Sequence, residues 1–359
     1  MPAEALSRLA RVGRKLLWAS LVLAPFTVAV DKFTGAGDVT LFVLAAIALI
    51  PLAWLIGEST EHAAEHTGPG IGGFLNASFG NAPELIVALF AVGANLPVVV
   101  RGSLAGSVIS NLLLVYGVTQ VVGPDGARID RRSLLVQLGL VGVAVVAFTF
   151  PTALGYTGAP ERHAVVVASV PVAIGLLLLY LLVVGRNLQR HREREREREE
   201  PGEGTWSLTT ALVTLAVATA ATAWVCEILV HSLGTFAKAV GLSDFFIAVV
   251  VVAVVGNAAE HGGAIIIARN GKMRLASEIA ISSSAQVALL IVPVVTLLSL
   301  LFTHQLALAF RWTELFAMAG AAAVVTAIVW DGRSSRREGW FLVIAYAATV
   351  IGFLLGGGR

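Results

Sequence analysis

Two short segments, far apart in the sequence, repeat a pattern of residues that could bind a cation. The pattern is Gly-Asn-Ala-x-Glu, and it occurs at residues 80–84 and 256–260, each time within a long apolar stretch. A carboxylate deep in a bilayer costs on the order of 2.5–3.5 kcal/mol, so it normally has a partner or lines a water-filled cavity. The glutamates of the two copies, Glu84 and Glu260, are therefore the first candidates for a functional site.

Each glutamate shares a helix face with the asparagine of its own copy. Asn81 and Asn257 precede their glutamates by three residues, a spacing that puts each pair on one side of a helix. The glycine before each asparagine permits close packing or a local break that frees backbone carbonyls. Four more polar side chains in the following spans could complete a shell around a cation; they are Ser107, Asn111, Ser283 and Gln286.

These candidate ligands are hard oxygen donors, which favour a hard cation. Ca²⁺ takes six to eight such oxygens, and two carboxylates balance its charge. Mn²⁺ also suits the set, whereas Na⁺ needs less negative charge. Two facing carboxylates repel each other in a low dielectric, so an empty site is expected to take up protons that Ca²⁺ expels. The alternative interpretation is that each glutamate only hydrogen-bonds a neighbouring helix.

A second group of titratable residues precedes the first copy of the motif. It comprises Glu58, Glu61, His62, Glu65 and His66. Glu58 and Glu61, together with Glu227 in the second half, could form proton or cation steps towards the centre, or they could lie in interfacial water. The run from His62 to His66 also matches the H-x-x-E-H pattern of zinc peptidases. No separate third ligand is evident, so an enzyme is the less favoured interpretation.

The composition predicts an integral membrane protein. The chain has 359 residues, of which 57% are hydrophobic and 13% charged, about half the charge of a soluble domain. A soluble enzyme and a nucleic-acid-binding protein are excluded. The single cysteine, Cys226, excludes a disulfide framework and a cysteine-based metal cluster.

Apolar stretches long enough to cross a bilayer predict eleven transmembrane helices. They lie near residues 15–33, 38–66, 70–96, 98–122, 133–150, 161–186, 206–232, 243–269, 274–302, 313–330 and 340–355. With the N-terminus inside, the inner loops hold 19 of the 25 Lys and Arg residues and the outer loops hold 6. Because positive charge stays on the cytoplasmic side, we expect a cytoplasmic N-terminus and a C-terminus on the opposite side.

A charged segment divides the chain into two membrane halves. The predicted organisation is an N-terminal segment with the first helix at residues 1–37, a five-helix repeat at 38–186, a charged cytoplasmic linker at 187–205 and a second five-helix repeat at 206–359. Five is odd, so the second repeat enters the membrane with the opposite orientation. The predicted fold is thus all-α, with two inverted-topology repeats, an architecture in which secondary transporters hold a midplane site.

The motifs resemble those of the calcium/cation–proton exchanger family, within the wider cation/Ca²⁺ exchanger superfamily. The resemblance is carried by residues 57–61, 75–84, 106–111, 241–243, 256–261 and 283–286, which occur in the expected order across both halves. Among them, the block Gly-Asn-Ala-Ala-Glu-His at 256–261 is specific, since sodium/calcium exchangers typically carry Gly-Thr-Ser-type motifs instead.

This resemblance implies proton-coupled Ca²⁺ export by alternating access. It implies a central site of Glu84 and Glu260, surrounded by Asn81, Asn257, Asn111 and Gln286, and it marks Glu61 and Glu227 as pathway acids. A Mn²⁺-preferring or Na⁺-coupled exchanger and a cation channel stay as alternatives. We expect no cofactor beyond the transported Ca²⁺ and H⁺, a location in a bacterial inner membrane, the lipid bilayer as partner, and a possible homo-oligomer.

Overall fold

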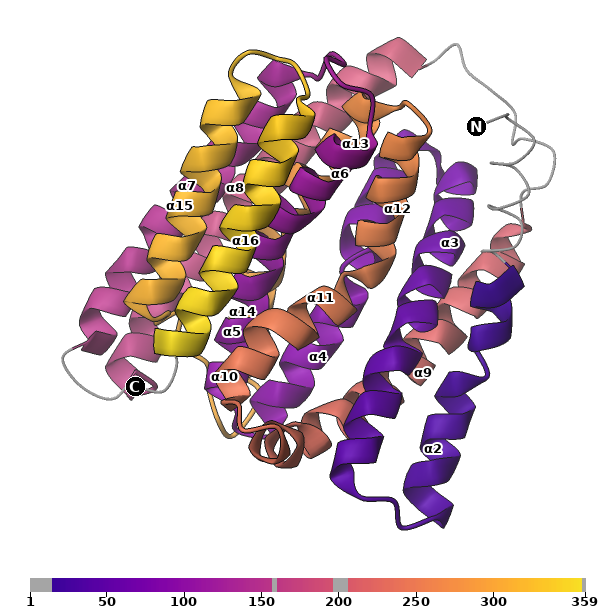
Figure 1. Ribbon diagram of the computed structural model, residues 1–359, viewed down its shortest axis with the longest axis vertical. Coiled ribbons are helices and arrows are strands. Elements are labelled where there is room, and N and C mark those ends of the chain that lie inside the picture. Colours follow the sequence, from indigo (N-terminus) through magenta and orange to yellow (C-terminus); the bar gives the residue numbers. More distant parts are fainter. Residues whose placement is uncertain (1–14, 157–159, 196–205, 357–359) are drawn as a thin grey trace.

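The described part of the chain is all-helical. The computed structural model describes residues 15–156, 160–195 and 206–356, and within these ranges the only β-type pairing is an isolated bridge between Arg128 and Arg333 (Figure 1). The helices of the first half are α2 (Leu23–Phe33), α3 (Asp38–Phe79), α4 (Ala82–Gly93), α5 (Pro97–Ile109), η1 (Ser110–Val115), α6 (Tyr116–Val122), α7 (Arg131–Tyr156) and α8 (His163–Glu195).

The second half has a corresponding series of helices. They are α9 (Leu208–Ala239), α10 (Asp244–Phe246), η2 (Ile247–Val252), α11 (Ala253–Gly256), α12 (Ala258–Arg269), α13 (Met273–Gln286), η3 (Val287–Ile291), α14 (Val292–Ser299), α15 (Trp312–Val329) and α16 (Arg336–Gly356). The segments labelled η have the wider π-helical turn.

The lengths and compositions of these helices fit a multi-pass membrane protein. Among the described residues, nine helices are long and apolar enough to cross a membrane, and the bent pair formed by residues 244–256 and 258–269 makes ten if it counts as one span. The short apolar helix α4 adds to these. The predicted total of eleven spans and the inverted repeat stay predictions.

The boundaries of the third predicted span differ from the structure. Helical structure continues from α3 through residues 67–69, where the sequence predicts a connection, and it ends at Phe79. The break comes at Gly80 and Asn81, and Pro83 occupies the first turn of α4. Proline is tolerated there because the N–H groups of the first turn have no partner within the helix.

The start of the predicted linker is helical, because α8 extends to Glu195. Residues 196–205 of that linker lie outside the described residues.

The helices form two groups that lie side by side. In Figure 1, α2, α3 and α9 stand apart from the remaining helices, and they pack on one another. Phe42 of α3 stacks on Phe236 of α9 with ring centroids 4.2 Å apart, and Thr235 donates a hydrogen bond of 2.7 Å to Asp38. Helices α4 and α12, which begin at the two motifs, contact both groups.

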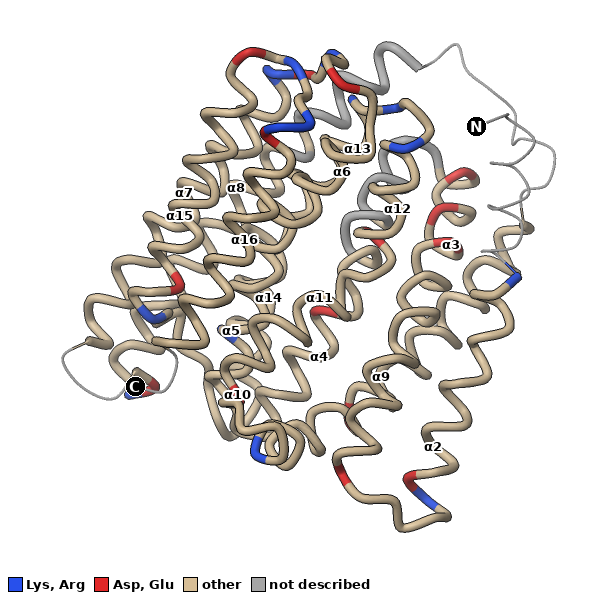
Figure 2. The backbone as a smooth tube through the Cα atoms, viewed as in Figure 1, with Lys and Arg blue, Asp and Glu red and all other residues tan. Residues whose placement is uncertain are grey.

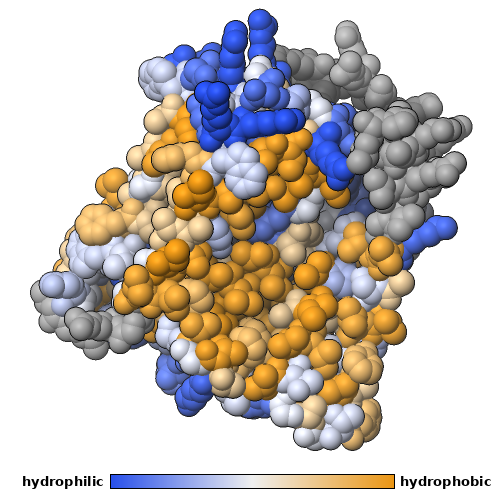
Figure 3. All heavy atoms as spheres, viewed as in Figure 1, coloured by the Kyte–Doolittle hydropathy of each residue, from blue (hydrophilic) through white to orange (hydrophobic). Residues whose placement is uncertain are grey.

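Charge is concentrated at one end of the bundle. Figure 2 shows Lys and Arg gathered at the top, around the loops that join α6 to α7, α12 to α13 and α15 to α16. Figure 3 shows a broad hydrophobic surface over the middle of the molecule. An apolar belt with basic residues at one end is the distribution expected for a protein that spans a bilayer.

Candidate cation site at the two helix breaks

The two copies of the repeated motif have the same local structure. Asn81 (φ −96°, ψ 16°) and Asn257 (φ −90°, ψ 6°) each precede a helix, so Glu84 and Glu260 both fall on the third residue of their helices. The N-terminus of a helix carries a partial positive charge that favours a carboxylate. Each break thus places one carboxylate in the first turn of a short helix.

The two carboxylates approach each other. Glu84 is 7% exposed and Glu260 is half-buried, and the two lie close enough to interact electrostatically. Gly256, the last residue of α11, lies beside Glu84. A Cβ added to this glycine would be 3.7 Å from the Glu84 side chain. The residues that the sequence predicts as central are therefore together in the fold.

A hydrogen-bond network joins the second motif to the spans that follow each copy. Asn257 donates through Nδ2 to Ser107 Oγ and to the Ala253 carbonyl, both at 2.8 Å. Asn111 donates to Ser283 Oγ at 3.2 Å and to Asn257 Oδ1 at 3.5 Å. Ser283 in turn donates to a carboxylate oxygen of Glu260.

The first motif makes a separate contact. Asn81 donates from Nδ2 to Gln286 Oε1 at 2.8 Å, which ties it to the span after the second motif. Glu84 Oε2 is buried and has no hydrogen-bond partner among the described residues. It borders a cavity of about 10 Å³ that Ser103 and Ser107 also line. A buried, unpaired carboxylate oxygen calls for a proton or a cation.

Close backbone packing brings these spans together. Gly106 of α5 lies against η2, and a Cβ there would be 2.1 Å from the Val249 carbonyl oxygen. Only glycine fits such an approach, and the next residue, Ser107, meets Asn257. Small residues at helix interfaces serve the same purpose throughout membrane proteins.

His261 belongs to the network, although it was not among the predicted site residues. Its Nε2 lies 2.9 Å from Asn111 Oδ1, and the side chain is buried. Both ends of the Asn111 amide therefore face protein partners in this conformation. The repeat itself gave no reason to include it, because the first copy has Leu85 at the equivalent position.

The acids of α3 lie away from this network. Figure 2 shows them on the upper part of α3, towards the basic end. His62 lies between Glu58 (3.8 Å) and Glu65 (3.7 Å), and its ring stacks on Trp206 at 4.7 Å. Glu61 is exposed. The described residues contain no group of three His, Cys, Asp or Glu side chains that could hold a metal ion, so the zinc-peptidase pattern does not form a metal site there.

Glu227 lines a groove on the other side of α4. With His231, Phe90 and Phe302 it borders a mostly apolar pocket of about 450 Å³. The neighbouring Cys226 is buried and lies close enough to Glu84 to interact with it electrostatically. Glu227 therefore lies on α9 beside α4. It is not a member of the central network.

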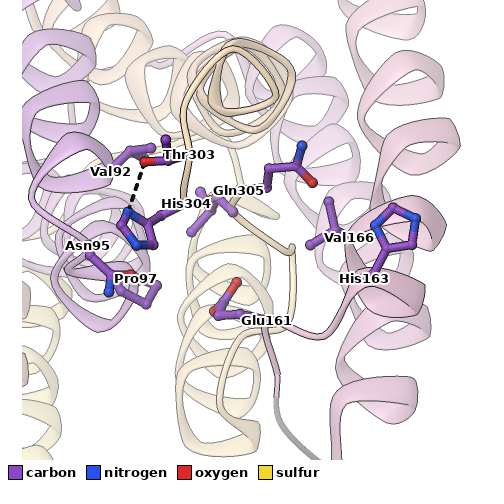
Figure 4. Close-up of a pocket in the computed structure, with 10 residues that line it drawn as sticks. Val92, Asn95, Pro97, Glu161, His163, Val166, Thr303, His304 and Gln305 are labelled. Carbon is purple, nitrogen blue, oxygen red and sulfur yellow. Dashed lines mark hydrogen bonds between the residues drawn. The ribbon is translucent and has the colours of Figure 1, made fainter.

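A polar pocket of about 240 Å³ lies at the end of the bundle opposite the basic loops (Figure 4). Figure 4 shows His304 on one side of it and His163 on the other, with Glu161 on the loop that leads into the helix of His163. Glu161 accepts hydrogen bonds from Arg101 and from the Ala307 backbone. The one carboxylate among the described residues that line this pocket, Glu161, is therefore already held by an arginine and a backbone N–H.

Comparisons with known proteins find relatives that match most of the chain. Residues 38–188 and 210–355 match the sodium/calcium exchanger protein family. The chain is 38% identical to the Ca²⁺/H⁺ antiporter ChaA of Bacillus subtilis, over 88% of the chain and 92% of that protein. It is 34% identical to a Ca²⁺/H⁺ antiporter of Synechocystis, over 94% of the chain and 97% of that protein. The solved structure of native YfkE superposes with a TM-score of 0.82 at 34% identity, covering 94% of this chain and 99% of that one.

Proposed function

The chain belongs to the sodium/calcium exchanger protein family, and from this membership we propose that it exchanges Ca²⁺ for H⁺ at a central site formed by Glu84 and Glu260. Curated relatives that match over most of the chain are Ca²⁺/H⁺ antiporters. The protein is accordingly a secondary transporter, not an enzyme, and it needs no cofactor. Ca²⁺ and H⁺ are the ions moved.

One observation carries the proposal for the site. Two carboxylates, each in the first turn of a helix that follows a break, lie close together inside a bundle whose middle is apolar. Two negative charges balance the charge of one Ca²⁺, and amide or hydroxyl oxygens of the Asn257 network can serve as further ligands. Glu84 Oε2, buried without a partner among the described residues, supplies an oxygen that is free for the ion.

Coupling follows from competition for the same oxygens. Ca²⁺ requires both carboxylates to be charged, whereas the empty site in a low dielectric favours their neutral forms. Binding of Ca²⁺ therefore releases protons, and protonation releases Ca²⁺. The empty, charged site reorients slowly, because a bare pair of carboxylates is costly to enclose. One site thus couples the two ions.

The division of the helices supports alternating access. Helices α2, α3 and α9 form one group and most of the others form the second, with α4 and α12 in contact with both. Sliding of one group against the other would open the centre to one side and then the other, as in other transporters with a midplane site. We also propose that the basic end in Figure 2 is cytoplasmic and that the membrane is a bacterial plasma membrane.

Transport by inverted membrane vesicles with an imposed pH gradient tests the function. We expect ⁴⁵Ca²⁺ uptake that persists without Na⁺ and collapses when a protonophore is added. Uptake that requires Na⁺ would assign a Na⁺-coupled exchanger, and stronger competition by Mn²⁺ than by unlabelled Ca²⁺ would assign a Mn²⁺-preferring one. Conductance without coupling to protons would assign a channel.

A further inference from the structure

A large pocket lies at the end of the bundle opposite the basic loops, where α7 ends and α15 begins. Its volume is about 480 Å³, and its walls also include the start of α5 and the end of α16. In Figure 1 these helix ends lie at the lower left, beside the C-terminus. The pocket contains none of the residues of the central network. Its polar lining consists mainly of Arg101, Thr152, Tyr156, Arg311, Trp312 and Thr313.

The two arginines of this pocket differ in what they bind. Arg101 is buried and forms an ion pair with Glu161, and it also donates to the Ala307 carbonyl at 3.3 Å. Arg311 instead stacks its guanidinium 4.4 Å from the ring centre of Phe245. Among the described residues the Arg311 guanidinium donates no hydrogen bond and has no ion pair within 4 Å, and its side chain lies near the backbone N–H of Glu314. A stacked guanidinium keeps its N–H donors available in its own plane.

The position of Arg311 is fixed by the start of α15. Its backbone N–H donates to Glu314 Oε2 at 2.5 Å, and the Glu314 side chain is buried beneath the turn. Glu314 lies close enough to interact with both arginines. Glu314, which is buried, and Glu161, which is partly exposed, thus lie near the two arginines at this end of the bundle, and the N–H donors of Arg311 remain available to an acceptor from outside.

A second donor without a partner lines the same pocket. Thr152 is 4% exposed, and its Oγ1 has no hydrogen-bond partner among the described residues. A buried hydroxyl that stays unpaired is costly, so such a group normally meets a water or a ligand. An anion held by Arg311 would accept from this hydroxyl as well.

The surroundings of the pocket are those of a membrane–water interface. Trp312 begins one candidate span and Tyr156 ends another, and these two residue types concentrate at the level of lipid headgroups. Beyond the pocket, the sides of α15 and α16 are apolar and exposed, with Phe316 at 69% and Leu355 at 81%. This surface gives acyl chains a place to lie, which a free anion would not need.

We propose that this pocket binds an anionic phospholipid through its phosphate, which accepts hydrogen bonds from Arg311 and Thr152. The acyl chains would follow the exposed faces of α15 and α16. The lipid would thereby join the ends of α7, α15 and α16 in the leaflet at the end with few basic residues. The proposal is independent of the ion exchanged at the central site.

Native mass spectrometry of the full chain in detergent tests the proposal, with phosphatidylglycerol, phosphatidylcholine and inorganic phosphate as probes. We expect one phosphatidylglycerol per molecule, bound at least fivefold more tightly than phosphatidylcholine, since a basic residue at the membrane surface contributes about that factor. Arg311→Gln should remove this preference. Thr152→Val, which keeps the side-chain shape, should weaken phosphatidylglycerol binding several-fold.

Lys238→Gln is the matched control, because Lys238 is an exposed cation in the last turn of α9 and does not line the pocket. It should leave the preference unchanged. If Arg311→Gln does not fold, Arg311→Lys and Thr152→Val test the same contacts, and thermal melting checks their folding. The proposal is overturned if Thr152→Val and the Arg311 variants bind phosphatidylglycerol as the wild type does, or if Lys238→Gln weakens it equally. Displacement of the lipid by millimolar inorganic phosphate would also overturn it in favour of a free-anion site.

Discussion

Asn257 donates a hydrogen bond of 2.8 Å to Ser107 Oγ. The two residues are 150 positions apart, and they connect the break of the second motif to the span that follows the first motif. Since Asn257 also accepts from Asn111, this contact links the network around Glu260 to the cavity beside Glu84. The two halves of the candidate site are thus joined by side chains as well as by proximity.

Ser107→Ala removes the acceptor of this hydrogen bond and leaves a buried amide N–H with one partner fewer. We expect the free energy of unfolding to fall by about 1–3 kcal/mol and the exchange rate to fall with it. Ser232→Ala is the control, since Ser232 is also buried and its hydroxyl bonds the carbonyls of Ile228 and Leu229 in its own helix. Thermal melting and ⁴⁵Ca²⁺ uptake would measure the two effects. Equal effects of both variants would argue against a special role for Ser107.

Neutralising either central carboxylate should abolish exchange. Glu84→Gln and Glu260→Gln keep the side-chain size but remove a negative charge that a bound Ca²⁺ needs. Both variants should still insert and fold, which detergent gel filtration would check. Glu65→Gln, in the exposed group on α3, should change uptake far less. If both central variants exchange ions at the wild-type rate, the central site is wrong and the acids of α3 become the better candidates.

Ca²⁺ affinity should rise with pH on the side from which Ca²⁺ binds. Protons and Ca²⁺ compete for the same oxygens, so a higher pH removes the competitor and lowers the half-saturating Ca²⁺ concentration. The limit is about tenfold per pH unit for each proton displaced. Initial rates of uptake at a series of pH values, with the opposite side held constant, would measure this. A half-saturating concentration independent of pH would contradict competition at one site.

Gly106→Ala should destabilise the fold strongly. The added Cβ would lie 2.1 Å from the Val249 carbonyl oxygen and 2.8 Å from the Ala253 Cβ, so α5 and η2 must separate. Overpacking of this kind costs about 1–3 kcal/mol or more. Gly142→Ala in α7, where nothing lies within 4 Å, should be neutral or stabilising. The melting temperatures of the two variants provide the comparison.

Cysteine labelling tests the proposed topology. With Cys226 replaced by alanine, a cysteine introduced at Glu195 should react from the cytoplasmic side, and one introduced at Arg359 from the opposite side. This follows from an odd number of spans between an inner N-terminus and an outer C-terminus. Labelling of both positions from the same side would require a different span count.

Local sequence patterns predicted most of the helices but not how they pair. The apolar runs and the repeated motif predicted where carboxylates would lie deep in the bundle, and Glu84 and Glu260 do lie together. The helical structure through residues 67–69 was not predicted, because Gly68, Pro69 and Gly70 usually mark a turn in water, whereas neighbouring helices tolerate them in a membrane.

Contacts that depend on tertiary structure left no local signal. His261 meets Asn111 across 150 residues, and Arg101 meets Glu161 across 60. Hydropathy places each of these residues in or beside a span, but their partners are decided by which helices pack together. The role of Glu227 in lining a groove beside α4 depends on the same packing.

The unequal exposure of the two central glutamates has a consequence for the order of events. Glu260 is half-buried, whereas Glu84 is 7% exposed. At the proposed site we therefore expect an ion that arrives in this conformation to exchange its first water molecules for oxygens of Glu260 and to reach Glu84 later. Dehydration is thereby divided into steps, and no single step strips the ion of its whole hydration shell. Release towards the same side would follow the reverse order, so that the contact between the ion and Glu84 breaks first.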